Sequence, residues 1–129
     1  MNESKFQLRE QRITKIKYNS NKNFDFDEPL SIDYDIKISQ NSLEDGFGIV
    51  TLDVGIFNKK NFDEVPFVIE ITIEGEFDWN SSIDGEELKM LLNVNAPAVL
   101  FSYLRPFISQ ITLFSGNPPL VLPLIDFTN

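Results

Sequence analysis

The sequence contains no cysteine and no histidine among its 129 residues. The absence of cysteine excludes disulfide bonds, thiolate nucleophiles and thiolate zinc sites, and the absence of histidine removes the usual general base and the commonest transition-metal ligand. The chain also lacks an apolar run near the roughly 18 residues of a membrane span, and its first residues include no apolar signal region. We therefore expect a cytoplasmic protein that is not an enzyme and has no cofactor or metal site.

The charge of the chain is acidic and unevenly distributed. Twenty Asp and Glu stand against eleven Lys and Arg, which gives a formal net charge of −9. Most of the basic residues precede residue 24, so the acidity is concentrated in the rest of the chain. An acidic body repels phosphate backbones, which disfavours nucleic acid as a partner and suits basic or apolar polypeptides. Alternatively, the acidity only keeps an aromatic-rich protein soluble.

Four segments alternate apolar and polar residues with the period of two that is typical of half-buried strands. They cover residues 6–18, 30–38, 46–57 and 65–79. The apolar positions change parity within the first segment, which predicts a bulge or a bend. Polar turns at residues 41–46 and 58–64 join the last three segments, so an antiparallel meander is the simplest pairing.

Three clusters of acidic side chains are the only candidates for a carboxylate site. They are Asp25, Asp27 and Glu28; Asp33 and Asp35; and Glu74, Glu76 and Asp78. A cation site needs about six to eight oxygen ligands and an acid/base pair needs one raised pKa, and neither can be inferred from these spacings. We interpret the last cluster as a solvated sheet face, because the residues between its members are the obvious core.

An amphipathic pattern over residues 96–115 predicts one long helix. Asn95 is a candidate N-cap, Pro97 suits a first turn, and Gly116 followed by Asn-Pro-Pro is a stop signal. Pro106 lies inside the helix, where it removes one backbone hydrogen bond and predicts a kink. The kink either wraps the helix over a sheet or shapes a groove.

The apolar faces of four strands exceed what one amphipathic helix can cover. A short helical turn predicted at residues 86–92 adds little area. Each large apolar side chain contributes about 1.5 to 3 kcal/mol when fully buried, so the remainder favours a second subunit. The sequence thus predicts an α+β subunit in an oligomer, with four antiparallel strands and a long kinked helix across one face.

Two phenylalanines, Phe24 and Phe26, lie in the polar segment between the first two strands, where nothing local can bury them. They either pin this segment to the subunit's own core or line a binding surface flanked by the main helix. If the segment folds back, their side chains form one surface with the apolar residues that follow: Leu30, Ile32, Tyr34 and Ile36.

The C-terminal part of the chain contains two adjacent motifs. The first is LFSYLR at residues 100–105 within the predicted helix, and the second is PLVLPLIDF at residues 119–127 after it. Together they resemble the SecB export-chaperone family, in which an L-F-P-Y-x-R helix is followed by an L-x-P-x-N-F segment. Ser102 stands at the family's usual proline, and Asp126 at its usual asparagine.

The resemblance implies a function and an assembly. The family holds unfolded preproteins without ATP, on their way to the translocase, and its subunits form a dimer of dimers. The chain would then be a single domain, 1–129, comprising a crossover loop (19–29), the main helix and a Pro-rich segment (117–129). The client-binding residues would be Phe24, Phe26, Leu30, Ile32, Tyr34 and Ile36.

Two departures from the family pattern modify these expectations. Lys17 and Asn21 occupy positions that are acidic in the family and dock the motor ATPase SecA, which weakens the expectation of SecA docking. The printed sequence stops two residues after Phe127, where family members usually continue into a further helix, so we expect a more open groove. The alternatives are a chaperone dedicated to one client, such as an antitoxin in a toxin-antitoxin-chaperone system, or a non-catalytic structural or regulatory oligomer.

Overall fold

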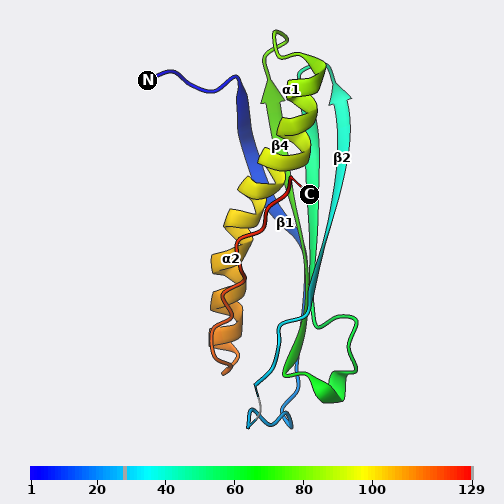
Figure 1. Ribbon diagram of the computed structural model, residues 1–129, viewed down its shortest axis with the longest axis vertical. Helices are drawn as coiled ribbons and strands as arrows, with labels where there is room; N and C mark the ends of the chain where they lie inside the picture. Colours follow the sequence, from blue (N-terminus) through cyan, green and yellow to red (C-terminus); the bar gives the residue numbers. More distant parts are fainter. Residues whose placement is uncertain (28, 129) are drawn as a thin grey trace.

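The computed structural model, which describes residues 1–27 and 29–128, contains one four-stranded antiparallel sheet with a long helix across one face (Figure 1). The predicted fold class is confirmed. Glu28, a member of the first acidic cluster, lies outside the described residues. The strands are β1 (Phe6–Ser20), β2 (Tyr34–Glu44), β3 (Phe47–Ile56) and β4 (Phe67–Trp79). The helical elements are the 3₁₀ turn η1 (Phe62–Glu64), α1 (Gly85–Met90), the π-helical turn η2 (Leu91–Asn95) and α2 (Ala96–Phe114).

The strand order is β1-β4-β3-β2, so only β2, β3 and β4 form the predicted meander. A meander of all four strands would place β1 beside β2, but the two lie at opposite edges of the sheet. The segment between them, residues 21–33, therefore crosses the end of the sheet. Backbone hydrogen bonds fix both of its ends, because Asn21 N–H donates to the Pro66 carbonyl and Phe57 N–H donates to the Asp33 carbonyl, each at 2.8 Å.

Two bulges in β1 explain its changes of apolar parity. The pairing with β4 shifts register between Leu8 and Glu10 and again between Ile13 and Lys15. Each shift adds one residue to β1, which restores the same apolar face after the irregularity. The apolar residues of β1 consequently all pair with odd-numbered positions of β4: Phe6 with Trp79, Leu8 with Phe77, Ile13 with Ile73, Ile16 with Ile71 and Tyr18 with Ile69.

The boundaries predicted for β2 are wrong at both ends. The strand begins at Tyr34, where its pairing with β3 begins, so residues 30–33 belong to the crossover segment. It continues to Glu44 through the polar residues that resembled a turn, because these are exposed positions that pair with the start of β3. The turn is confined to residues 45 and 46, where Gly46 adopts a φ of 85° that favours glycine.

One continuous helical stretch, from Gly85 to Phe114, crosses the sheet. Its start is capped by Asp84, whose carboxylate accepts the Glu87 N–H at 2.8 Å. The predicted N-cap at Asn95 is wrong, because η2 carries the chain directly from α1 into α2 and leaves Asn95 in helical conformation. No helix in the described residues is long and apolar enough to span a membrane.

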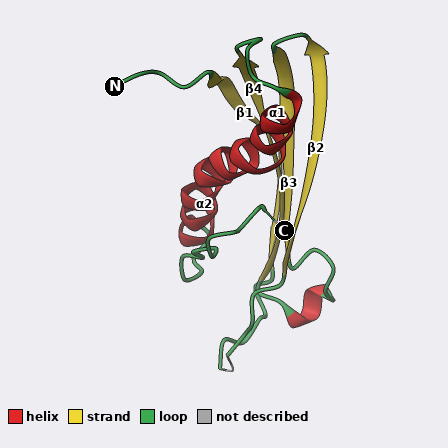
Figure 2. Ribbon diagram, turned by 45° about the horizontal axis from the view of Figure 1, so that its top comes forward, coloured by secondary structure: helices red, strands yellow, loops and turns green. Residues whose placement is uncertain are grey.

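The C-terminal end of α2 follows the sequence signals. Gly116 has a φ of 84°, and the next N–H, that of Asn117, returns to the Thr112 carbonyl at 3.0 Å, which ends the helix. α2 continues through Pro106, which lies on its exposed side, and its axis changes direction along its length (Figure 2). The residues after Gly116 run back along the helix (Figure 1).

The core lies between α2 and the central strands β3 and β4. Alternate residues of both strands are buried beneath the helix, and Gly75 permits its close approach, because a Cβ there would lie 2.7 Å from Leu100. The fully buried members include Val50, Leu52 and Ile56 of β3, Ile69 and Ile73 of β4, and Leu100, Leu104 and Ile108 of α2. The opposite face is polar, and includes the ion pairs Lys17–Glu70 (3.4 Å) and Arg12–Glu76 (3.4 Å).

Candidate functional site

An apolar cleft of about 260 Å³ opens where the crossover segment meets the residues that follow α2. Three distant parts of the chain line it. They are the crossover segment (Phe26, Leu30 and Ile32), the adjoining ends of β3 and β4 (Phe57, Pro66 and Phe67) and the segment after α2 (Pro118, Pro119 and Leu120). Every described residue that lines it is apolar, so the cleft can bury an apolar group, and these residues offer no side chain for catalysis.

The floor of the cleft is a fixed pair of aromatic rings. Phe57 and Phe67 meet edge to face with 5.5 Å between ring centroids, and both are buried. Tyr18 in turn stacks on Phe67, with 5.9 Å between ring centroids. Phe57 has a φ of 56°, which is strained for a bulky residue and is held here by its hydrogen bond to Asp33. Strain of this kind clusters at functional sites.

One wall of the cleft is anchored to α2 by hydrogen bonds. The hydroxyl of Thr112, the one buried polar side chain among the described residues, accepts the Leu120 N–H at 2.9 Å. Two residues further on, Arg105 Nε donates to the Leu122 carbonyl at 2.9 Å. Because Leu120 and Leu122 are themselves buried, backbone and side chains together fix this wall in place.

The same segment continues into the end of the second sequence motif. Phe127 packs edge to face on Phe101 of α2, with 5.9 Å between ring centroids. Asp126 accepts the N–H of Thr128 at 2.9 Å and its hydroxyl at 2.5 Å, and these two bonds lower the pKa of the Asp126 carboxyl. An aspartate at the motif's asparagine position therefore retains an acceptor that organises the local turn.

Three of the six residues predicted to contact a client lie together in the cleft. Phe26, Leu30 and Ile32 line it, and their exposed fractions are 53%, 40% and 39%. Such exposure is high for large apolar side chains that converge on one hollow, so these residues form a surface that a partner can reach.

The other three predicted residues occupy different surroundings. Phe24 is half-buried, contacts Phe26 edge to face at 4.9 Å, and lines a neighbouring hollow with three carboxylates, those of Asp25, Asp27 and Glu64. Tyr34 and Ile36 lie within β2 and pack partly buried against the core. The predicted single surface is therefore divided between a cleft, its rim and the core.

The remaining lining residues could not be assigned to the site from the sequence. Phe57 and Phe67 had the pattern of ordinary strand residues, and the two prolines at 118 and 119 were interpreted only as part of a helix stop. They meet for two reasons. Residue 57 directly follows β3 and residue 66 directly precedes β4, and these two strands are paired. The segment after Gly116 turns back toward the same end of the sheet. The proline pair was the one usable signal, since it favours an extended and rigid wall.

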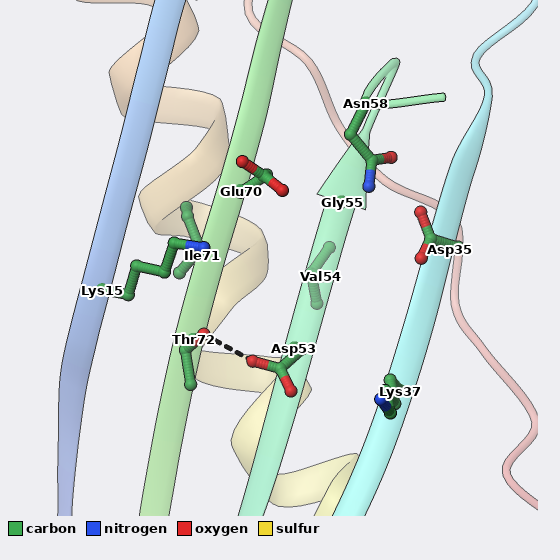
Figure 3. Close-up of a pocket in the computed structure, with 10 residues that line it drawn as sticks. All are labelled: Lys15, Asp35, Lys37, Asp53, Val54, Gly55, Asn58, Glu70, Ile71 and Thr72. Carbon is green, nitrogen blue, oxygen red and sulfur yellow. Dashed lines mark hydrogen bonds between the residues drawn. The ribbon is translucent and has the colours of Figure 1, made fainter. Parts of the chain in front are cut away.

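A second hollow, of about 270 Å³, lies on the polar face of the sheet (Figure 3). Charged side chains of both signs line it: Lys15, Asp35, Lys37, Asp53 and Glu70. Thr72 Oγ1 donates to Asp53 at 2.5 Å, and Asn58 lies over Gly55, where it leaves no room for a side chain. Within residues 1–27 and 29–128, no group of three acidic residues could hold a metal ion. The hollow is therefore a polar surface of mixed charge, distinct from the cluster of Glu74, Glu76 and Asp78, which does not line it.

Comparison with known proteins identifies relatives along most of the chain. The family model described as SecB, preprotein translocase subunit SecB, matches residues 3–129. The protein-export protein SecB of Rhodospirillum centenum is 29% identical over 98 residues, which cover 76% of this chain and 58% of that protein. The SecB of Chromobacterium violaceum is 34% identical over 96 residues, which cover 74% of this chain and 63% of that protein. The match thus spans only about three fifths of these curated relatives.

Solved structures share the fold at low identity. A SecB-like chaperone of Mycobacterium tuberculosis, in complex with a peptide from an antitoxin, has a TM-score of 0.74 at 17% identity, covering 94% of this chain and 91% of that one. A protein of unknown function from Streptococcus agalactiae has a TM-score of 0.53 at 10% identity, covering 95% of this chain and 99% of that one. These likenesses support the fold, and the family match over nearly all residues shows that the chain belongs to the SecB family.

Proposed function

We propose that the protein is an ATP-independent holding chaperone that binds apolar segments of unfolded or nascent polypeptides in the cytoplasm, in protein export. The observation that carries the proposal is an exposed cleft with apolar lining residues and an aromatic floor in a subunit of the SecB family. Binding to the unfolded state covers aggregation-prone segments and shifts the folding equilibrium by mass action, so holding needs no nucleotide.

The surroundings of the cleft suit a polypeptide client. Large aromatic side chains supply contact area and lose little entropy on binding, and Phe26 presents such a ring at the entrance. The adjoining hollow adds the carboxylates of Asp25, Asp27 and Glu64 beside the apolar surface. An extended segment with apolar side chains would thus meet the cleft, and any basic flanking residue would meet a rim of opposite charge.

The proposal includes assembly into a dimer or tetramer. α2 covers β3 and β4 but exposes apolar side chains on its outer side: Val99, Tyr103, Leu113 and Phe114. The last of these is 83% exposed, and side chains this apolar along one helix face favour a second copy as their cover. Sedimentation in moderate salt should give a dimer or tetramer, and a monomer at micromolar concentration would contradict this part of the proposal.

SecA is not assigned as a partner. At the two positions where the resemblance implies acidic docking residues, Lys17 pairs with Glu70, and Asn21 donates through Nδ2 to the backbone carbonyls of Phe62 and Val65. These residues therefore serve the fold of this chain. The holding activity proposed here requires only the cleft.

A chaperone dedicated to one client is the second candidate. The solved SecB-like chaperone with the same fold is bound to an antitoxin peptide, so a single-client role is compatible with this architecture. A panel of unrelated unfolded proteins separates the candidates, because a general holder should suppress the aggregation of many and a dedicated chaperone that of one. A purely structural oligomer should suppress none.

The direct test is aggregation of a chemically unfolded protein after dilution, monitored by light scattering with and without the chaperone. We expect suppression near one oligomer per client, unchanged by ATP. The same assay with the client already folded is the control, because a holder binds the unfolded state only. No suppression of any client in the panel would overturn the proposed function.

A further inference from the structure

Three hollows at the end of the sheet meet at one side chain. Leu30 lines the apolar cleft, the hollow that contains Phe24, and a further hollow of about 240 Å³. The last of these is also lined by Ser31, Phe57, Lys60, Glu64 and Val65. Leu30 is the only side chain that the three share among the described residues.

The apolar cleft and the 240 Å³ hollow share two lining side chains, those of Leu30 and Phe57. Phe57 is fixed, because it is 1% exposed, packs on Phe67, and has its backbone bonded to Asp33. Leu30 is 40% exposed and lies in the crossover segment, outside any helix or strand. Of the two shared side chains, Leu30 is thus the one that a substitution can remove without disturbing the aromatic floor of the cleft.

We propose that Leu30 determines which client side chains the cleft accepts, an inference that rests on the proposed function. At about 260 Å³, the cleft is smaller than the roughly 300 to 1,000 Å³ of small-molecule sites, so it suits a single side chain. Removal of the Leu30 side chain beyond Cβ would open the cleft toward this adjoining hollow of about 240 Å³ and so enlarge the space that a client side chain can enter.

The enlarged space would favour a particular class of side chain. The hollow that shares Leu30 is also lined by the charged residues Glu64 and Lys60, whereas the described residues that line the cleft are apolar. Tryptophan matches such a gradient, because its large ring is apolar and its indole N–H needs an acceptor when buried. With Leu30 in place, the shorter cleft favours leucine or phenylalanine as the anchoring residue of the client.

The test uses one extended, lysine-flanked host peptide with a single central guest residue, leucine, phenylalanine or tryptophan, and fluorescence anisotropy. Leu30→Ala should raise the affinity ratio of the tryptophan peptide to the leucine peptide about tenfold, the effect of one or two apolar groups in a pocket. Leu30→Phe should change the ratio in the opposite direction, so the test does not depend on the folding of one variant.

Leu43→Ala is the matched control, because Leu43 is exposed, lies near the opposite end of the sheet, and lines none of the described hollows. It should leave the ratio unchanged. If the wild-type protein binds the peptides but both Leu30 variants have the same tryptophan-to-leucine affinity ratio as the wild type, the proposed role of Leu30 is overturned while the proposed function stands. If wild type binds none of the guest peptides, the proposed function fails, and the inference fails with it.

Discussion

The sheet face that meets α2 has two halves with the same alternating sequence pattern but different exposure. One half is β3 and β4, and the other is β2 with the crossover residues that precede it. On β3 and β4, the alternating apolar residues are covered by α2, and Leu52 and Ile73 are completely buried. On β2, Ile38 pairs with Leu52 on the same face but remains 36% exposed, as do Ile32 and Leu30 beyond it to a similar extent. The alternation therefore predicts which side chains share a face, but the position of the helix decides which are covered.

The difference between the halves has an energetic meaning. Burying a large apolar side chain contributes about 1.5 to 3 kcal/mol, so the covered half supplies much of the folding free energy. The uncovered half forgoes that contribution and keeps apolar surface available to a partner. We therefore expect substitutions in the covered half to change stability, and substitutions in the uncovered half to change binding.

The largest expected effect is in the covered half. Leu104→Ala removes a fully buried side chain of α2 and should lower the free energy of unfolding by about 2 to 5 kcal/mol. Urea denaturation measures the loss, with Leu43→Ala as an exposed leucine control that should change stability by less than about 0.5 kcal/mol. Equal losses in the two variants would show that the division into covered and uncovered halves is wrong.

A smaller loss of stability is expected where the segment after α2 is bonded to the helix. Thr112→Val removes the acceptor of the Leu120 N–H and leaves that buried group unpaired, which should cost about 1 to 3 kcal/mol. Ser115→Ala is the control. The hydroxyls of Thr112 and Ser115 both donate to a carbonyl of α2, but Ser115 is exposed. An unchanged melting temperature for Thr112→Val would mean that this bond does not anchor the wall of the cleft.

In the uncovered half, the expected effect is on binding. Phe26→Ser should weaken capture of an unfolded test protein by about 1 kcal/mol or more, and leave the melting temperature and oligomeric state nearly unchanged. Phe24→Ser should weaken capture less, because Phe24 contacts Phe26 but does not line the cleft. Titration calorimetry gives the affinities. If a variant that combines Phe24→Ser and Phe26→Ser unfolds while its folded fraction binds normally, the two rings stabilise the core instead of binding the client.

The smallest effect is expected on the polar face. Replacing Glu74, Glu76 and Asp78 together with glutamine should change stability little and leave holding intact, because exposed ion pairs contribute about 0 to 1 kcal/mol. In this variant Arg9 loses its partner Asp78, whereas Arg12 loses Glu74 and Glu76 but keeps its ion pair with Glu10 at 3.2 Å. Circular dichroism and the aggregation assay are the measurements. A folded variant that no longer holds clients would place a binding site on this face.

Local patterns predicted most of the fold. Period-two alternation located the strands, and the changes of parity in β1 indicated its bulges, now placed near residues 9 and 14. Errors arose where local signals compete with pairing. The mostly polar residues 41–44 resembled a turn, although their pairing with β3 makes them part of β2. Asn95 resembled a cap, although η2 continues the helix through it.

The candidate site was less predictable, because its parts are distant in the sequence. Phe26, Leu30 and Ile32 could be predicted as client-binding residues, because they are apolar residues in or beside a polar segment. Their partners, Phe57, Pro66 and Pro118, acquire a role only when the crossover segment and the segment after α2 reach the same end of the sheet. No local spacing encodes that meeting, so only the three-dimensional arrangement shows it.

The central claim is that unfolded polypeptide binds in the apolar cleft between the crossover segment and the segment after α2. Site-specific photo-crosslinking tests it most directly, with a photoreactive residue placed in turn at positions 26, 32, 43 and 74, and a permanently unfolded test protein as client. The account predicts crosslinks from positions 26 and 32, which line the cleft, and none above background from the two distant positions. Crosslinks from position 43 or 74 with none from 26 and 32 would contradict it.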